Sequence, residues 1–258
     1  MNLEETLRSA RDRGRKLLIG YMTGGFSDDW TEIVRACADA GCDAMEIGIP
    51  FSDPAMDGPT VQEASTRALQ RGATPSTILD DLRTIDAGIP LVAMTYYNLV
   101  VRNGEGRFAG ELAAAGICAA IVPDLPLEES AGWEQAAADN GIETVLLVAP
   151  VSPDERITRI AERSHGFVYT VSQMGVTGER ATLASSAAAT ARRVKALTDK
   201  PVVIGFGIST PAHAVEACQA ADGVVVASAL LRKLLDGGGP EEAAAFMRSI
   251  RDALDSSS

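Results

Sequence analysis

Three carboxylates lie close together in one turn-rich segment of the sequence, residues 46–60. Glu46 falls inside a short apolar run, and Asp53 and Asp57 follow it among prolines and glycines. A carboxylate in an apolar run loses its hydration unless it points into a polar site, and perturbed groups of this kind are typical of functional sites. Acidic side chains in turns also serve solvation and helix capping, and that alternative stays open for each of the three taken singly. It fits Glu46 least well, so Glu46 is the first candidate for acid–base chemistry.

Eight short runs of β-branched and aliphatic residues recur along the chain, each followed by a loop and an amphipathic stretch. The predicted strands are Leu17–Met22, Ala44–Ile47, Leu91–Thr95, Ala119–Val122, Thr144–Val148, Phe167–Val171, Val202–Gly205 and Val224–Ala227. Short continuous apolar runs are typical of parallel strands buried on both faces, with helices as the crossovers. Eight such units predict an α/β fold, a single (β/α)8 TIM barrel over residues 1–258. A doubly wound open sheet is the alternative, but no Gly-x-Gly-x-x-Gly follows the first strand.

Helix-start and helix-stop signals support this division. Ser27-Asp28-Asp29 predicts a helix running to about Ala40, Ser152-Pro153-Asp154-Glu155 predicts another, and Thr210-Pro211 places proline in a first helical turn. Gly41, Gly116 and Gly141 each stand directly before a strand, as glycine caps do. The charged segment before the first strand, residues 1–16, predicts an extra helix that closes the bottom of the barrel.

In a barrel of this kind, catalytic residues lie in the loops that follow the strands. Gly205 and Gly207 after the seventh strand, and Ala227 and Ser228 after the eighth, are candidates for binding a phosphate. Glycine lets backbone N–H groups approach closely and a helix N-terminus adds a favourable dipole, so the lack of nearby basic residues in the sequence is no objection. The alternative is that Gly205 and Gly207 only permit a tight turn.

Composition limits the classes of partner. The 258 residues are 46% apolar and 22% charged, with a net charge of −12, which disfavours nucleic acid and anionic membranes as partners. We expect a cytoplasmic protein, because no segment has the pattern of a signal peptide or a membrane span.

The four cysteines, Cys37, Cys42, Cys118 and Cys218, are expected to be reduced and mostly buried. His165 and His213 are too far apart to indicate a metal cluster or a catalytic triad, and we expect both to be structural or surface residues.

Several blocks of sequence resemble the tryptophan synthase α subunit family. They are residues 46–62 (EIGIPFSDPAMDGPTVQ), 94–98 (MTYYN), 122–126 (VPDLP), 175–178 (GVTG) and 205–209 (GFGIS). The likeness covers nearly the whole chain, and the first block is the most specific. It implies a carbon–carbon lyase that cleaves indole-3-glycerol phosphate to indole and glyceraldehyde 3-phosphate by a retro-aldol reaction. The resemblance implies neither a cofactor nor a metal.

The resemblance also implies roles for individual residues. Glu46 would be the general acid and base, Asp57 would accept a hydrogen bond from the indole N–H, and Tyr169 would contact the carboxylate pair. Glu46 would be held rigidly by its strand, whereas Asp57 would lie on a mobile loop that closes over substrate. The family's indole pocket matches Tyr21, Met94, Tyr96, Ile121, Leu147 and Phe206, and its phosphate site matches Gly178, Gly207, Ala227 and Ser228. Asp53 would communicate with a β subunit, the expected partner, in an α2β2 assembly.

The chain departs from the family pattern in loops. Ala227 stands where glycine is usual, so phosphate binding there requires that its φ be negative. The other departures are Gly24-Gly25-Phe26-Ser27 in the first loop, Gln173-Met174 in the sixth and Leu99 after Asn98. Three hypotheses therefore stay open: an ordinary α subunit, a free-standing lyase that supplies indole elsewhere, and a weakly active protein that mainly activates a β subunit.

Overall fold

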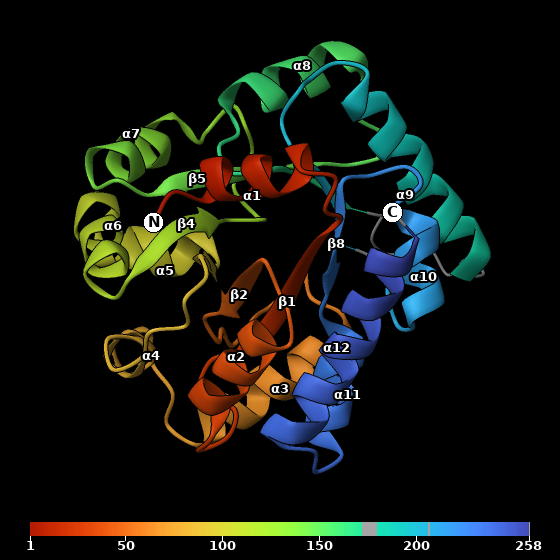
Figure 1. Ribbon diagram of the computed structural model, residues 1–258. Helices are drawn as coiled ribbons and strands as arrows, with labels where there is room; N and C mark the ends of the chain where they lie inside the picture. Colours follow the sequence, from red (N-terminus) through yellow and green to blue (C-terminus); the bar gives the residue numbers. More distant parts are fainter. Residues whose placement is uncertain (172–179, 206, 258) are drawn as a thin grey trace.

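The strands form a closed parallel barrel inside a ring of helices (Figure 1). The computed structural model describes residues 1–171, 180–205 and 207–257. Each strand pairs with the next along the chain, and β8 closes the barrel by pairing with β1. The predicted (β/α)8 TIM barrel is therefore confirmed, and the open-sheet alternative is wrong.

The strands correspond to the eight predicted apolar runs, with ends that differ by at most two residues. They are β1 Leu17–Thr23, β2 Ala44–Gly48, β3 Leu91–Met94, β4 Ile117–Ile121, β5 Glu143–Val148, β6 Val168–Thr170, β7 Val202–Ile204 and β8 Gly223–Val226. Nearly all of these strand residues are buried, since one face lines the barrel interior and the other packs on helices.

The described residues also form twelve helices. They are α1 Leu3–Asp12, α2 Trp30–Asp39, α3 Pro59–Gln70, α4 Pro75–Leu82, α5 Tyr97–Asn103, α6 Glu105–Ala114, α7 Ala131–Asp139, α8 Asp154–Arg163, α9 Arg180–Lys195, α10 Pro211–Ala217, α11 Ser228–Leu235 and α12 Pro240–Ser256. Two helices instead of one follow each of β2, β3 and β8. The break between α5 and α6 occurs at Gly104, whose φ of 84° suits glycine and interrupts a helix.

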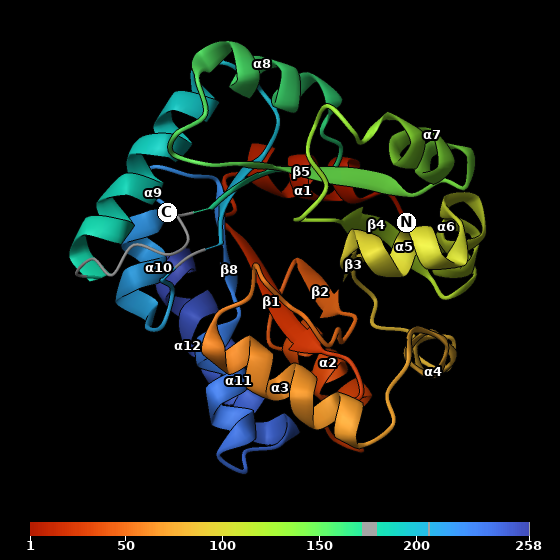
Figure 2. The same cartoon turned by 180° about the vertical axis from the view of Figure 1, so that it is seen from behind.

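The N-terminal helix covers the end of the barrel where the strands begin. Leu3 and Leu7 are fully buried, and the Glu143 carboxylate at the start of β5 accepts hydrogen bonds from the backbone N–H groups of Leu3 and Glu4. Glu4 in turn accepts one from the N–H of Gly166, just before β6. Figure 2 shows α1 beside β5 from behind, as Figure 1 does from the front. The predicted extra helix at the barrel bottom is confirmed.

Some of the predicted helix starts and stops are confirmed, and others are wrong. Pro211 is the first residue of α10, as predicted, and Thr210 caps the helix by accepting a hydrogen bond from the N–H of His213. Gly41, Gly116 and Gly141 all have positive φ, which confirms the predicted glycine stops. Asp29 and Pro153 occupy the N-cap positions of α2 and α8, but neither makes a side-chain cap. The predicted capping by side chains is therefore wrong at these two helices.

A buried ionic network joins α12 to the start of β1 and β2. The Asp43 carboxylate accepts a hydrogen bond from the N–H of Leu18 at 2.8 Å and one from Arg15 Nε at 2.6 Å. Arg251 of α12 is buried, and its Nη1 lies 3.4 Å from the same carboxylate and donates to the Lys16 carbonyl at 2.7 Å. Asp43 thus holds two guanidinium groups and one strand N–H at the bottom of the barrel.

Replacing Asp43 with alanine should lower the free energy of unfolding by about 3–5 kcal/mol, because it removes the carboxylate shared by Arg15, Arg251 and the Leu18 N–H and leaves the buried Arg251 only the exposed Asp255 as a partner. Urea unfolding followed by circular dichroism measures the effect. Asp12→Ala is the matched control, since Asp12 pairs with Arg11 at the surface and should cost at most about 1 kcal/mol. Equal effects of the two substitutions would contradict a structural role for the network.

All four cysteines are buried and unpaired, as expected. His165 is exposed at the surface and His213 is partly buried. No helix among the described residues is long and apolar enough to cross a membrane. The described part of the chain also brings together no group of three or more His, Cys, Asp and Glu side chains that could hold a metal ion.

Candidate active site

Glu46 is the most unusual residue of the barrel. It is the third of the five residues of β2, so it lies within the strand and not after it, and its side chain is fully buried. Neither carboxyl oxygen has a hydrogen-bond partner among the described residues. Burial raises the pKa of Glu46 to about 8, because the ionised form would lose its hydration without compensation. The carboxyl group is therefore mostly protonated at neutral pH.

Asp57 lies in the loop between β2 and α3, near the carboxyl end of the barrel. Its N–H donates to the Pro54 carbonyl at 3.1 Å, and its own carbonyl accepts from Gln62 Nε2 at 2.9 Å. Burial raises the pKa of the Asp57 carboxyl to about 6, and a hydrogen bond with the Tyr96 side chain opposes that rise. Asp57 is therefore mostly ionised at neutral pH, so the two carboxyl groups differ in charge.

Buried tyrosines adjoin the two carboxyl groups. The charges of both Glu46 and Asp57 contribute to raising the pKa of Tyr21 and of Tyr169, in addition to burial. A Cβ at Gly48 would overlap the Tyr21 hydroxyl, and one at Gly205 would overlap that of Tyr169. Glycine at these two positions therefore makes room for the tyrosines. The structure thus brings Tyr169 close to both carboxylates, which is where the sequence places it.

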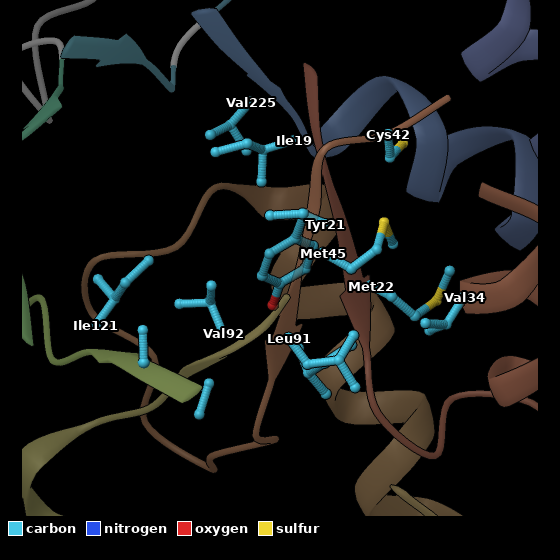
Figure 3. Packing of buried hydrophobic residues seen from close by; sticks show 14 of the residues in the cluster. Ile19, Tyr21, Met22, Val34, Cys42, Met45, Leu91, Val92, Ile121 and Val225 are labelled. Carbon is cyan, nitrogen blue, oxygen red and sulfur yellow. The ribbon is translucent and has the colours of Figure 1, made fainter. Parts of the chain in front are cut away.

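The predicted apolar wall comes from neighbouring strands at matching levels. The strand register pairs Tyr21 with Glu46, Met94 with Ile121 and Leu147 with Tyr169. Tyr21 and Ile121 are buried, and Figure 3 shows both within the packed core beside Val92. Met94 and Leu147 are partly exposed. These side chains can border a flat apolar ring; Phe206 lies outside the described residues.

A large cavity opens beside the loops that follow β7 and β8. Its volume is about 1310 Å³, and Gly207, Ala227 and Ser228 line it. Gly207 has a φ of 78°, which requires glycine, whereas Ala227 has a φ of −113°, which any residue adopts. Ala227 therefore meets the condition that its φ be negative. Ser228 is the first residue of α11, so helix N–H groups face the cavity. Gly178 lies outside the described residues.

The burial of Glu46 has a measurable consequence for stability. Its pKa of about 8 in the folded chain exceeds the ordinary value of 4.5, so the folded state holds a proton that the unfolded state releases between these pH values. Stability therefore falls as pH rises through this window, and the cost is complete above about pH 8. Relative to wild type, Glu46→Gln should gain nothing below pH 4.5 and a few kcal/mol above pH 8. Urea unfolding at a series of pH values measures the difference.

A gain that stays constant from pH 5 to pH 8 would contradict a raised pKa at Glu46. Asp57→Asn is the matched comparison, because the pKa of Asp57 is raised only to about 6. The gain in free energy of unfolding of Asp57→Asn over wild type should be complete near pH 6 and should not grow at higher pH.

The chain was compared with known families, curated proteins and solved structures. Residues 7–253 match the family model described as tryptophan synthase alpha chain. A tryptophan synthase alpha chain of Gloeobacter violaceus is 48% identical over 91% of this chain and 88% of the relative, and one of Streptomyces coelicolor is 43% identical over 94% and 90%. The chain belongs to the tryptophan synthase alpha chain family.

Solved structures of the family have the same fold. The aminoacrylate-bound tryptophan synthase of M. tuberculosis has a TM-score of 0.87 at 36% identity, with 98% of each chain covered. Tryptophan synthase subunit alpha of Legionella pneumophila has a TM-score of 0.88 at 30% identity, with 99% of each chain covered. This chain therefore shares the barrel fold of these family members.

Asp53, the predicted site of communication with a partner, lies at the surface. Its side chain is exposed on the same loop as Asp57, and its carboxylate accepts a hydrogen bond from Ser52 Oγ at 2.6 Å. Three residues separate it from Asp57. A partner that contacts Asp53 would therefore touch the loop that carries the Asp57 carboxylate.

Sequence reasoning missed several groups that line the large cavity. The basic ones are Arg192, Arg232 and Lys233, and His213 joins them, with its Nδ1 3.1 Å from Ser209 Oγ. The expected lack of basic residues near the phosphate loops is thus wrong in three dimensions. Spacing could have found Arg232, because it comes one helical turn after Ser228 on α11 and such residues share a face. No comparable signal marked Arg192, which comes from α9.

Proposed function

We propose that this chain is the α subunit of tryptophan synthase and cleaves indole-3-glycerol phosphate to indole and glyceraldehyde 3-phosphate. The observation that carries the proposal is a buried, protonated Glu46 and an ionised Asp57 that both adjoin the side chains of Tyr21 and Tyr169. This reaction needs an acid for a ring carbon and an anion for a developing positive charge, and the two carboxyl groups supply one each. Family membership supports the same activity.

Glu46 would begin the reaction as the general acid. It transfers its proton to C3 of the indole ring, which becomes tetrahedral and leaves positive charge at the ring nitrogen. Asp57 accepts a hydrogen bond from the ring N–H and stabilises that charge. The Glu46 carboxylate then removes the proton of the 3′-hydroxyl. The C3–C3′ bond breaks, its electron pair restores the aromatic indole, and the hydroxyl carbon leaves as the aldehyde of glyceraldehyde 3-phosphate. Glu46 ends the cycle protonated.

The other predicted residues would bind and orient the substrate. Tyr21, Met94, Tyr96, Ile121, Leu147 and Phe206 would enclose the indole ring, since a planar apolar group is best held by such walls. Gly178, Gly207, Ala227 and Ser228 would hold the phosphate. The negative φ of Ala227 and the start of α11 at Ser228 support this assignment. Tyr169 would help to position the Glu46 carboxyl group.

The expected partner is a tryptophan synthase β subunit, which would take the released indole directly. Asp53 is exposed on the loop between β2 and α3, which also carries Asp57. This position supports its assignment as the residue that communicates with that partner. We further propose that residues 1–258 act as one catalytic domain, because the barrel that carries the site spans the chain, and that the protein works in the cytoplasm.

The deciding experiment is indole formation from indole-3-glycerol phosphate by the purified chain, alone and with a β subunit added. Slow cleavage that rises sharply with the β subunit would support the proposal. Fast cleavage that ignores the β subunit would favour a free-standing lyase. The absence of indole under both conditions would overturn the assigned reaction.

A further inference from the structure

Tyr96 contacts two points of the loop between β2 and α3, which carries Asp57. It lies two residues after the end of β3 and directly before the first residue of α5, and its side chain is 6% exposed. The hydroxyl oxygen accepts a hydrogen bond from the backbone N–H of Met56 at 2.9 Å. The ring stacks on Phe51, with centroids 5.2 Å apart and planes inclined by 28°. Tyr96 therefore contacts the loop at Phe51 and again at Met56, directly before Asp57.

The same hydroxyl also reaches the catalytic carboxylate. Its oxygen accepts from the N–H of Met56, which leaves its own proton free, and hydrogen bonding by Tyr96 lowers the pKa of the Asp57 carboxyl group. The hydroxyl therefore lies beside the carboxylate of the residue that follows its backbone donor. Movement of the loop would break the bond to Met56 and carry the Asp57 carboxylate away from the hydroxyl.

The residue next to Tyr96 anchors it from the other side. The backbone N–H of Tyr97 donates to Asp124 Oδ1 at 2.9 Å. The Tyr97 hydroxyl takes no part in this anchor, because it donates to Glu105 Oε1 at 2.9 Å. Asp124 belongs to the loop after β4. The start of α5 is therefore bound to the β4 loop, independently of the loop that carries Asp57. This bond fixes the backbone next to Tyr96.

We propose that Tyr96 is a positioning residue, whose hydroxyl and ring together hold the loop of residues 51–57 in the conformation that presents the Asp57 carboxylate to the indole nitrogen. This inference rests on the proposed function and adds to it, since the sequence suggests for Tyr96 only a place in the apolar wall.

The described groups that face Asp57 are hydroxyls. Tyr21 comes from β1, Tyr96 from the end of β3 and Tyr169 from β6, and the Asp57 charge contributes to raising the pKa of each. Of the three, Tyr96 is the one whose hydrogen bond lowers the pKa of Asp57. Removing that hydroxyl should therefore raise the pKa of Asp57 above 6 and leave less of the carboxylate ionised at neutral pH.

The test is Tyr96→Phe, which keeps the ring and its stack on Phe51 but removes the hydroxyl that accepts from the Met56 N–H and lowers the pKa of Asp57. We expect kcat for cleavage to fall by about 10- to 100-fold at pH 7, as for a misplaced catalytic group, with a small change in KM. The acid limb of the kcat profile should move to higher pH. Tyr97→Phe is the matched control: its hydroxyl bonds Glu105 instead, so kcat and the acid limb should stay as in wild type.

Phe51→Leu separates the two parts of the contact. It loosens the stack but keeps the hydroxyl, so it should lower kcat without moving the acid limb. Wild-type kcat and an unmoved acid limb in Tyr96→Phe would overturn the inference, and so would an equal response in Tyr97→Phe.

A second measurement needs no activity. Carboxyl ¹³C NMR titration of the free protein, with the Asp57 signal assigned from Asp57→Asn, gives the pKa of Asp57. An equal Asp57 pKa with and without the Tyr96 hydroxyl also overturns the inference. Failure of wild type to release indole would instead contradict the proposed function.

Discussion

Replacing Glu46 with glutamine should lower kcat for indole formation by about 10³-fold or more, with KM nearly unchanged. The amide keeps the shape of the side chain but can neither deliver a proton to C3 nor remove one from the 3′-hydroxyl. Because both proton transfers depend on the same group, the loss should be near the upper end for acid–base catalysis. Steady-state kinetics under saturating substrate measure it directly.

Glu143→Gln is the matched control for this substitution. Glu143 is also a strand glutamate of the barrel, but it lies at the opposite end, where it accepts hydrogen bonds from the start of α1. Its replacement should leave kcat within a few fold of wild type. If Glu46→Gln keeps turnover within a few fold as well, Glu46 is not the acid and base of this reaction.

Replacing Asp57 with asparagine should lower kcat by about 10²- to 10³-fold, because a neutral amide cannot stabilise the positive charge that develops at the ring nitrogen. The substrate in its ground state carries no such charge, so KM should change little. The pH dependence gives a second readout. Asp57 must be ionised and Glu46 protonated, so wild-type activity should rise as pH passes about 6 and fall as it passes about 8.

In Asp57→Asn the remaining activity should lack the rise near pH 6 and keep the fall near pH 8. Asp252→Asn is a control for the loss of one negative charge, since Asp252 is exposed on α12. An effect of Asp57→Asn on KM alone would count against stabilisation of the transition state by this carboxylate.

The barrel could be predicted because its strands are encoded locally. A parallel strand buried on both faces reads as a continuous apolar run, and eight such runs separated by amphipathic stretches leave few alternative folds. The glycine stops at Gly41, Gly116 and Gly141 were predictable for the same reason, since a positive φ is a property of a single residue. The caps of α2 and α8 were not, because a capping hydrogen bond depends on where a side chain turns in three dimensions.

Candidate catalytic residues could also be named from the sequence. Glu46 stands out in an apolar run, and the segment from Glu46 to Gln62 carries a specific family resemblance. Comparison with known proteins confirms the family, and the structure brings Glu46, Asp57 and Tyr169 together at one place.

The sequence by itself determined the number and order of the strands and the family, and it named Glu46 and Asp57 as candidates, because each of these depends on local patterns of residue type. Only the tertiary structure decided the pKa values of these carboxyl groups and the contacts that position them. Complete burial without a hydrogen-bond partner sets the raised pKa of Glu46, and contacts across 40 residues of sequence bring the Tyr96 hydroxyl to Met56 and Asp57. Desolvation and long-range hydrogen bonds arise from the packing of the closed barrel, which no spacing along the chain records.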